Sequence, residues 1–354
     1  MNKREKLLKM LRRQGYDEVL YTFALCPALE KIYRETTGST LPYDEYYGFP
    51  WRELPHPVAS DTDLTRFYPY HDTIDHSNTV IDEWGIGHRS TPSSMHMTQM
   101  LHPLNKAESV EELETYPLPV YREEDNTMIA RRAKEIRDSG FAAVGQMQMT
   151  IWETAWYLRG MENLMMDMIS EDEMAEVHLK RVEAGAISQA QMYARAGADI
   201  IYLGDDIGMQ QSIMMSQPLY QTWIKPALTR VIRAAKEINP DVLIFYHSCG
   251  YIEPLIPDLI EAGIDVLNPI QPECMDFEKI HSLYGDVVSF HGTVGTQSTM
   301  PYGTKKDVFD AVEKHLRIAG PKGGLLIGPT HLLEPDVPWE NVLYFMEACK
   351  AFQG

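Results

Sequence analysis

The feature that most constrains this chain is a regular alternation of short apolar segments with amphipathic segments from residue 141 onward. The apolar segments are rich in β-branched residues and are predicted as strands at residues 141–147, 199–203, 242–247, 266–270, 287–291 and 325–328. The segments between them carry apolar residues at helical spacing, at residues 171–196, 220–237, 252–261 and 306–319. Strands that alternate with helices in this way are typical of βα units around a parallel sheet.

A barrel accounts best for this alternation. An earlier apolar segment at residues 19–25 is a seventh predicted strand, and we expect one more strand in the N-terminal part. We therefore predict an α/β fold, a distorted (β/α)₈ or TIM barrel with an irregular N-terminal extension, a fold that typically takes about 250 residues and tolerates insertions. It would form one domain over residues 1–354, with an irregular part at 1–126 and regular βα units at 127–354. A doubly wound open sheet is the alternative, but such folds usually begin with a glycine-rich phosphate turn, and no GxGxxG or GxxxxGK[ST] motif is present.

The charge balance excludes several classes of partner. The chain has 32 Lys and Arg residues against 51 Asp and Glu residues, a formal net charge of −19 at pH 7. So acidic a surface repels phosphate backbones and anionic lipids, and we expect neither nucleic-acid nor membrane binding. No apolar run approaches the roughly 18 residues of a membrane span. Four cysteines in a chain of 354 residues make no disulfide framework, so we expect a reducing cytoplasm.

The strongest candidate for chemistry lies at the end of the predicted strand at 242–247. His247 and Cys249 are two residues apart, so their side chains point to the same side of an extended chain. In a barrel, the carboxyl end of a strand is where active sites are built. Imidazole and thiolate are both good zinc ligands, and we predict a metal site here. The alternative is that Cys249 is a small buried residue and His247 an ordinary hydrogen-bonded one.

A third metal ligand is expected from a different strand. His331 follows the glycine-flanked apolar segment at 323–328, after a tight turn. Three protein ligands with an open fourth position are the pattern of catalytic zinc, so His247, Cys249 and His331 form the predicted set. His331 could instead act as an acid or as a hydrogen-bond donor.

Other polar residues near strand ends are candidates for contact with a substrate. Asp205 and Asp206 follow the strand at 199–203, and we predict that at least one of them is catalytic while the other caps a helix or bonds Arg159. His291 ends the strand at 287–291 and is a third catalytic candidate, or a group that orients a ligand. The predicted substrate-binding residues are Gln146, Gln148, Gln210 and Tyr246.

Several motifs resemble those of the uroporphyrinogen decarboxylase superfamily, within its corrinoid-dependent methyltransferase branch. Residues 247–250 resemble the zinc-binding His-x-Cys-Gly of that branch, and residues 335–341 resemble the superfamily's Pro-x-x-Pro-x-Glu-Asn tail. Residues 158–164 are similar to its Leu-Arg-Gly-x-Glu helix, and residues 204–210 match a pattern common in members of unassigned function. The resemblance implies a distorted TIM barrel with the site at its carboxyl mouth, one zinc ion per chain and a corrinoid. The chain lacks a corrinoid-binding Asp-x-His-x-x-Gly motif, so the corrinoid would arrive on a partner protein.

Two departures from the family patterns shape the functional prediction. The decarboxylases carry an N-terminal Arg-Gln-Ala-Gly-Arg segment whose arginines clamp the acid groups of the porphyrinogen, and the region from Arg13 to Ala28 has no such pair. In the thiol-methylating members the third ligand is a cysteine, whereas His331 stands at that place here. A His/Cys/His site would keep one net positive charge on zinc and favour a hard oxygen as substrate atom.

We therefore predict a zinc-dependent methyltransferase. It would move a methyl group between a small donor, such as an O-methylated aromatic or methanol, and the corrinoid of a partner protein, with zinc as Lewis acid. The alternatives are a metal-free decarboxylase-like lyase, a methylcorrinoid:thiol or folate methyltransferase, and a non-enzymatic scaffold on the same barrel. A homodimer is one assembly that the sequence allows.

Overall fold

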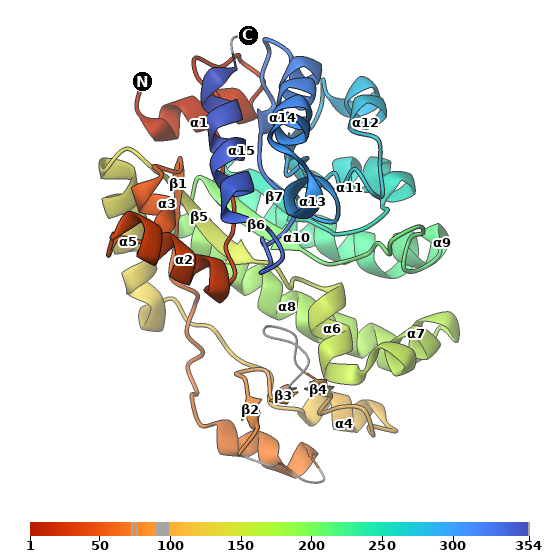
Figure 1. Ribbon diagram of the computed structural model, residues 1–354. Coiled ribbons are helices and arrows are strands. Elements are labelled where there is room, and N and C mark those ends of the chain that lie inside the picture. Colours follow the sequence, from red (N-terminus) through yellow and green to blue (C-terminus); the bar gives the residue numbers. More distant parts are fainter. Residues whose placement is uncertain (72–73, 75–76, 90–98, 353–354) are drawn as a thin grey trace.

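A curled sheet of seven parallel strands forms the centre of the computed structural model, which describes residues 1–71, 74, 77–89 and 99–352 (Figure 1). In their order across the sheet the strands are β1 (Trp51–Glu53), β5 (Ala142–Met147), β6 (Ile200–Gly204), β7 (Leu243–His247), β8 (Val266–Asn268), β9 (Ser289–His291) and β10 (Leu325–Leu326). Each strand pairs with its neighbour in parallel. The predicted distorted (β/α)₈ barrel is confirmed.

Helices connect the strands and cover the outside of the sheet (Figure 1). The predicted helices at 171–196, 220–237, 252–261 and 306–319 correspond to α8 (Glu173–Ala196), α10 (Lys225–Ile238), α11 (Ile256–Ala262) and α14 (Lys305–Ala319). The π-helical turn η3 (Tyr220–Ile224) precedes α10, because Pro226 in the first turn of α10 has no N–H to continue one helix through this point. The remaining helices of this part are α5 (Thr127–Asp138), α6 (Trp152–Arg159), α7 (Met161–Ile169), α9 (Gln217–Leu219), η4 (Glu253–Leu255), α12 (Phe277–Tyr284), α13 (Thr299–Tyr302) and α15 (Trp339–Ala351).

The N-terminal part supplies two edges of the barrel. The expected extra strand is β1, which pairs with β5. The predicted strand at 19–25 is not a regular strand: it joins the sheet only through two isolated parallel bridges, Tyr21 to Ile327 and Leu25 to Leu333. The barrel is therefore distorted on the side where this segment stands in place of a regular strand. The rest of this part is more regular than the sequence suggested, with α1 (Lys3–Leu11), α2 (Pro27–Thr37), α3 (Tyr43–Tyr46), η1 (Leu64–Tyr70), α4 (Val110–Thr115), η2 (Glu124–Asn126) and an antiparallel sheet of β2 (Thr79–Ile81), β3 (Gly87–Arg89) and β4 (Gln99–Leu101).

The interior of the barrel is a separate apolar core, filled in layers. Alternate residues of the strands point inward, and a buried cluster joins Ala142, Val144, Ile200, Tyr202, Leu243, Phe245, Val266 and Leu326. Helix α1 closes the amino end of the barrel, because its Leu7, Leu8 and Leu11 pack into the same cluster. At the other end the next inward positions are polar, Gln146, His247, Asn268 and His291. Apolar packing stops one layer below the carboxyl mouth, where polar groups begin.

Among the described helices, none is both long enough and apolar enough to cross a bilayer.

Candidate metal centre and the adjoining cavity

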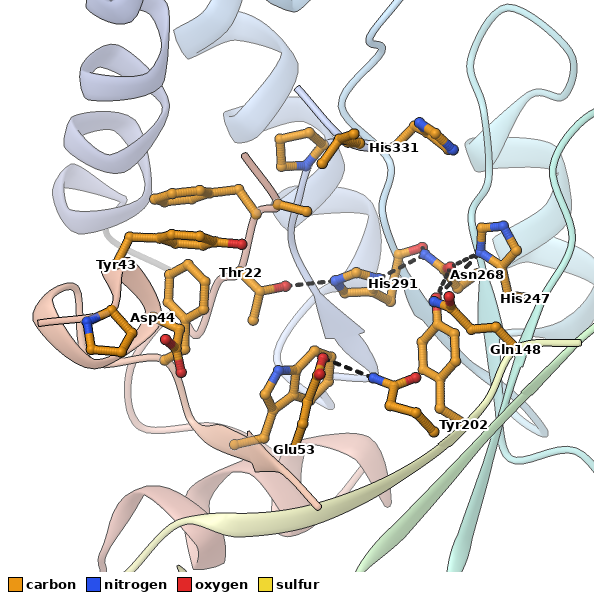
Figure 2. Close-up of a pocket in the computed structure, with 18 of the residues that line it drawn as sticks. Thr22, Tyr43, Asp44, Glu53, Gln148, Tyr202, His247, Asn268, His291 and His331 are labelled. Atoms are coloured by element: carbon orange, nitrogen blue, oxygen red, sulfur yellow. Dashed lines mark hydrogen bonds between the residues drawn. The ribbon is translucent and has the colours of Figure 1, made fainter. Parts of the chain in front are cut away.

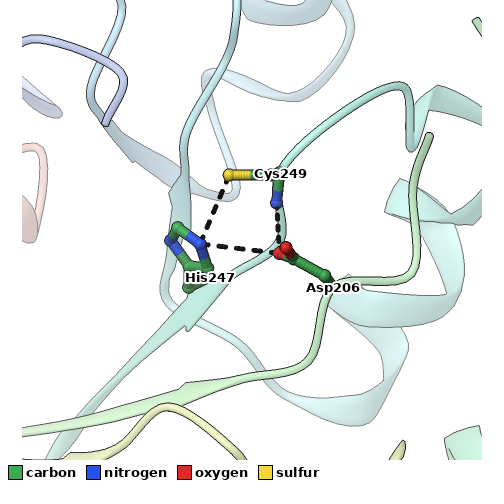
Figure 3. A group of neighbouring side chains, drawn as sticks. All are labelled: Asp206, His247 and Cys249. Carbon is green, nitrogen blue, oxygen red and sulfur yellow. Dashed lines mark hydrogen bonds and ion pairs between the residues drawn. The ribbon is translucent and has the colours of Figure 1, made fainter. Parts of the chain in front are cut away.

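Three potential metal ligands converge at the carboxyl ends of β6 and β7 (Figure 3). One ligand atom from each of Asp206, His247 and Cys249 lies within 4.8 Å of the other two. The Cys249 Sγ is 3.5 Å from the His247 Nε2, which is also 3.5 Å from the Asp206 Oδ1. We call these three residues the Asp–His–Cys group. The predicted pairing of His247 with Cys249 follows from their alternation, whereas Asp206 comes from the loop after β6.

A chain of hydrogen bonds fixes which nitrogen of His247 carries the proton (Figure 2). The amide nitrogen of Asn268 donates to the His291 carbonyl at 3.2 Å, and a carbonyl only accepts, so the amide oxygen must face the other way. That oxygen lies 2.6 Å from the His247 Nδ1 and also accepts from the Tyr202 hydroxyl at 2.8 Å. His247 therefore carries its proton on Nδ1, and the lone pair of Nε2 faces Cys249 and Asp206. This is the tautomer that a metal ligand requires.

His291 lies at the other end of this chain of hydrogen bonds. Its Nδ1 is 2.7 Å from the Asn268 amide nitrogen and its Nε2 is 2.7 Å from the Thr22 hydroxyl. Burial, with a smaller contribution from His247, lowers the pKa of His291 to about 3. His291 is therefore neutral at physiological pH, accepting from Asn268 and donating to Thr22. It lines the cavity, as predicted for a mouth residue, and it orients Asn268.

Charge around Cys249 favours a cation. Burial raises the pKa of the Cys249 thiol well above its usual range, and the nearby carboxylates of Asp206 and Glu153 raise it further. Asp206 is held in place because the Cys249 amide donates to its Oδ1 at 2.7 Å. A bound divalent ion reverses this balance, since a coordinating thiol loses its proton to the metal. The donor set of one imidazole, one thiol and one carboxylate fits zinc.

Glu153 on α6 is a neighbour of the group that the sequence did not single out. Burial and the Asp206 carboxylate raise the pKa of Glu153 to about 7. Its carboxylate accepts from the Tyr157 hydroxyl at 2.7 Å and from the Asp206 amide at 3.2 Å. Glu153 thus fixes the backbone at Asp206, and with this pKa it is only partly ionised at neutral pH.

A cavity of about 680 Å³ opens beside the group, and His247 forms part of its wall (Figure 2). This volume lies within the range typical of small-molecule sites. The polar lining near His247 consists of neutral groups, Thr22, Gln146, Gln148, Tyr202, Asn268 and His291. Aromatic side chains form the walls farther along, Phe23, Tyr43, Phe49 and Trp51.

The predicted site residues fall into two sets. The structure brings His247, Cys249 and Asp206 together, and it places His291, Gln146, Gln148 and His331 in the lining of the cavity. His331 is exposed there and does not belong to the Asp–His–Cys group.

Three further candidates lie away from the cavity lining. Asp205 is fully buried and accepts backbone N–H groups of Thr150, Ile151 and Glu153, so it anchors the start of α6. Tyr246 is fully buried on the outer face of β7, because it alternates with the inward His247. Gln210 is exposed and bonds the side chain of Gln297 at 3.1 Å.

Sequence reasoning missed several residues that shape the site. Asn268 and Tyr202 carried a usable signal, since each is a polar or aromatic residue at an inward position of a predicted strand. Trp51, Glu53 and Thr22 carried none, because β1 is too short to show a period and residues 19–25 form only isolated bridges.

Fold and site together define a (β/α)₈-barrel protein with a cluster of three potential metal ligands at the carboxyl mouth of the barrel. The sequence model of the uroporphyrinogen decarboxylase (URO-D) family matches residues 91–352, and the chain belongs to this family.

The similar proteins include both decarboxylases and methyltransferases. The chain is 23% identical over 172 residues to a uroporphyrinogen decarboxylase of Hydrogenobaculum sp., covering 49% of this chain and 47% of the relative. It is 21% identical over 174 residues to the methylcobamide:CoM methyltransferase of Methanosarcina barkeri, covering 49% and 48%. The matches thus span about half the length of these curated relatives. A methyltransferase from Methanosarcina mazei shares the fold over 99% of this chain and 98% of its own, with a TM-score of 0.69 and 18% identity. The two methyltransferases support the resemblance to the methyltransferase branch.

Proposed function

We propose that the protein is a zinc-dependent methyltransferase that moves a methyl group from a small O-methylated molecule to the corrinoid of a partner protein. The observation that carries this proposal is the convergence of Asp206, His247 and Cys249 beside a substrate-sized cavity that His247 lines. The tautomer of His247, set by Asn268, supports the same conclusion. The likeness to methyltransferases of Methanosarcina agrees with it.

In this proposal His247 Nε2, Cys249 Sγ and an Asp206 oxygen would hold the zinc ion. Asp206 then takes the place that the sequence assigned to His331, and His331 contacts the substrate from the cavity lining. A carboxylate is a harder ligand than a second thiolate, so this set suits a metal that meets an oxygen atom of the substrate. When bound, zinc would supply Lewis acidity that makes the ether or alcohol oxygen a better leaving group.

The protein's own residues would bind and orient the donor. Gln146 and Gln148 offer amide groups to the oxygen atoms of a neutral donor, and the aromatic walls exclude water from its apolar part. The C–O bond would break with both electrons remaining on oxygen, and the methyl group would pass to the partner's reduced corrinoid, whose electron pair would form the new bond. The oxygen then takes up a proton from solvent.

A decarboxylase acting on a polycarboxylated tetrapyrrole fits the cavity less well. Among the described residues that line it, Arg34 is the single arginine or lysine, while Glu30, Asp44 and Glu53 are acids. Paired arginines are the natural clamp for substrate carboxylates, and this lining does not offer them.

Metal content and methyl transfer together test the proposal. We expect about one zinc per purified wild-type chain by mass spectrometry, as for a catalytic site with three protein ligands. Cys249→Ala is expected to lose more than nine-tenths of that zinc. Cys274→Ala is the matched control, because Cys274 is a half-buried thiol outside the Asp–His–Cys group.

The activity assay follows methylation of cob(I)alamin by methoxylated aromatics and methanol. We expect transfer from at least one donor with wild-type and Cys274→Ala protein, and none with Cys249→Ala. A zinc-replete protein that transfers methyl groups from no O-methyl donor would contradict the proposed direction. Full activity in a metal-free protein would contradict the zinc assignment.

A further inference from the structure

We propose that the cavity selects its methyl donor by charge, and that it takes a donor bearing an ammonium group at the end remote from the transferred methyl. This inference rests on the proposed function, because it treats the ligand as a methyl donor. The inference itself concerns which ligand the cavity binds. It follows from the charges, the aromatic rings and the strand order at the mouth of the barrel.

Acidic groups outnumber basic ones in the cavity lining. Glu30, Asp44 and Glu53 line it, and Arg34 is the single arginine or lysine among the described lining residues. Arg34 on α2 and Glu53 on β1 are both exposed, so water screens both charges, whereas Glu30 and Asp44 are half-buried. Asp44 has a partial counter-charge in Arg52, at 3.6 Å. The lining therefore attracts a cation and repels a carboxylate.

Glu53 and Trp51 form the most specific part of this lining. They are two residues apart on β1, so both side chains face the cavity. The Trp51 ring is held edge-on to Phe245, with ring centroids 5.8 Å apart, and is tilted against His291 at 5.7 Å. The Glu53 Oε1 accepts from the Gln146 amide at 2.9 Å, which orients the carboxylate (Figure 2). An indole ring with a carboxylate beside it is a good receptor for an ammonium group.

A second, smaller cavity continues the acidic surface beyond Glu53. It measures about 250 Å³ and shares Glu53, Gln146 and Gln148 with the large one. Its lining adds Glu83 and His56, and burial raises the pKa of Glu83, which favours its neutral form. Carboxyl groups thus continue along the β1 edge of the mouth, and Glu53 remains the one that both cavities share.

Strand order sets the distance between the two ends of the donor. Strands β5 and β6 separate β1 from β7, so Glu53 and His247 lie three strand intervals apart. At about 4.8 Å per interval this is roughly 14 Å along the curved sheet, and less across the mouth. A donor with one aromatic ring between its methoxy group and its ammonium group would span this gap. Methanol would not reach Glu53.

Three ligands on one scaffold test the proposal by isothermal titration calorimetry with the zinc-loaded protein. They are 2-methoxy-4-methylphenol, 4-hydroxy-3-methoxybenzylamine and 4-hydroxy-3-methoxybenzoate, with charges of zero, plus one and minus one. We expect the amine to bind about tenfold more tightly than the neutral phenol and the benzoate about tenfold more weakly, since each tenfold step is a modest electrostatic difference. Glu53→Gln should abolish most of the preference for the amine and leave the neutral phenol within about twofold.

Glu237→Gln is the matched control, because it removes the same charge from an exposed position at the end of α10. It should leave all three affinities unchanged. Equal or tighter binding of the benzoate, an amine preference that survives Glu53→Gln, or binding of none of the three would overturn the proposal. These titrations need no corrinoid and no turnover. Amine-selective binding without methyl transfer would therefore refute the proposed function and leave the charge selection standing.

Discussion

The proton on His247 decides what the Asp–His–Cys group can bind. A histidine protonated on Nε2 would present an N–H to Cys249 and could not ligate a metal there. Asn268 prevents this because its amide oxygen accepts a hydrogen bond from the Nδ1–H, at 2.6 Å. The Tyr202 hydroxyl and the His291 carbonyl hold the amide in that orientation. The buried side-chain amide of Asn268 therefore holds His247 in the tautomer that can bind a metal.

Replacing Asn268 should weaken metal binding without removing a ligand. We expect Asn268→Leu to lower zinc affinity by about 10- to 100-fold, the usual effect of losing an outer hydrogen-bond partner of a ligating histidine. Competition with a chromophoric chelator measures this change. Asn268→Asp keeps an acceptor for His247 and should stay much closer to wild type. Equal affinity in Asn268→Leu and wild type would show that the amide does not set the tautomer.

Of the two neighbouring aspartates, we expect Asp206 to support metal binding and Asp205 to support the stability of the fold. Asp206→Asn is expected to lower zinc affinity, because a neutral amide is a poorer ligand than a carboxylate, with a change in the free energy of unfolding below about 1 kcal/mol. The same chelator competition and a urea titration of the metal-free protein give both quantities. A zinc affinity unaffected by Asp206→Asn, together with a large loss in His331→Ala, would restore His331 as the third ligand.

At the scale of elements, Asp205 connects the end of β6 to the start of α6 through hydrogen bonds. Its carboxylate accepts from the backbone amides of Ile151 at 3.0 Å and Glu153 at 2.9 Å, which are N–H groups at the start of α6 without partners inside the helix. Because Asp205 and Ile151 are both fully buried, water cannot replace the hydrogen bond between them.

Removing this carboxylate should destabilise the fold. We expect Asp205→Ala to lower the free energy of unfolding by about 3 kcal/mol or more, since each unsatisfied buried donor costs about 1–3 kcal/mol. Urea denaturation of metal-free protein tests this value. Asp206→Asn serves as the comparison at the next position. A stable Asp205→Ala protein that has lost methyl transfer would instead indicate a direct part in catalysis.

Sequence periodicity predicted the regular half of the barrel and the part of the site that depends on it. Strands β5 to β10 were recognisable from their apolar runs, and alternation continued past the end of β7 places Cys249 on the same side as His247. The same alternation argues against Tyr246, which lies on the outer face of β7. The segment at 19–25 was predicted as a strand but makes only isolated bridges, and the further N-terminal strand was expected without a position, because β1 has only three residues. Contacts between loops, such as that of Asp206 with Cys249, have no period in the sequence.

On the scale of the whole molecule, helix α1 closes the end of the barrel opposite the site. Leu7 is fully buried in the barrel core, and Arg4 grips the Asp199 carboxylate at 2.7–3.0 Å. Helix α1 is thus held against the amino ends of the strands by apolar packing at Leu7 and by the ion pair of Arg4 with Asp199.

Truncating Leu7 should therefore affect stability but not ligand binding. We expect Leu7→Ala to lower the free energy of unfolding by about 2–5 kcal/mol through the cavity it leaves. Ile169→Ala is the control, because Ile169 is exposed on α7 and should cost less than about 0.5 kcal/mol. Urea unfolding followed by circular dichroism compares the two. Equal effects of both substitutions would mean that α1 does not fill the barrel.

Buried histidines far from the site should make stability fall with acidification. Burial lowers the pKa of His178 and of His315 to about 4 in the folded protein. The unfolded chain takes up these protons at about pH 6.5, so the free energy of unfolding falls as pH drops from about 6.5 to 4, by at most about 1.4 kcal/mol per pH unit for each residue.

His178→Gln isolates one of these contributions, since glutamine can still donate to the Ala155 carbonyl that His178 contacts at 2.9 Å. Metal-free wild type and variant should show different slopes of unfolding free energy against pH between about 6.5 and 4, with the shallower slope in the variant. Identical slopes would mean that His178 titrates normally in the folded state.

X-ray absorption at the zinc edge of the purified protein tests the central claim most directly. We expect one zinc per chain with a single sulfur ligand at about 2.3 Å and the remaining nitrogen and oxygen ligands at about 2.0–2.2 Å. The sulfur contribution should vanish in Cys249→Ala and persist in Cys274→Ala. A protein that holds no zinc, or holds it with no sulfur ligand, would contradict a metal centre built on Asp206, His247 and Cys249.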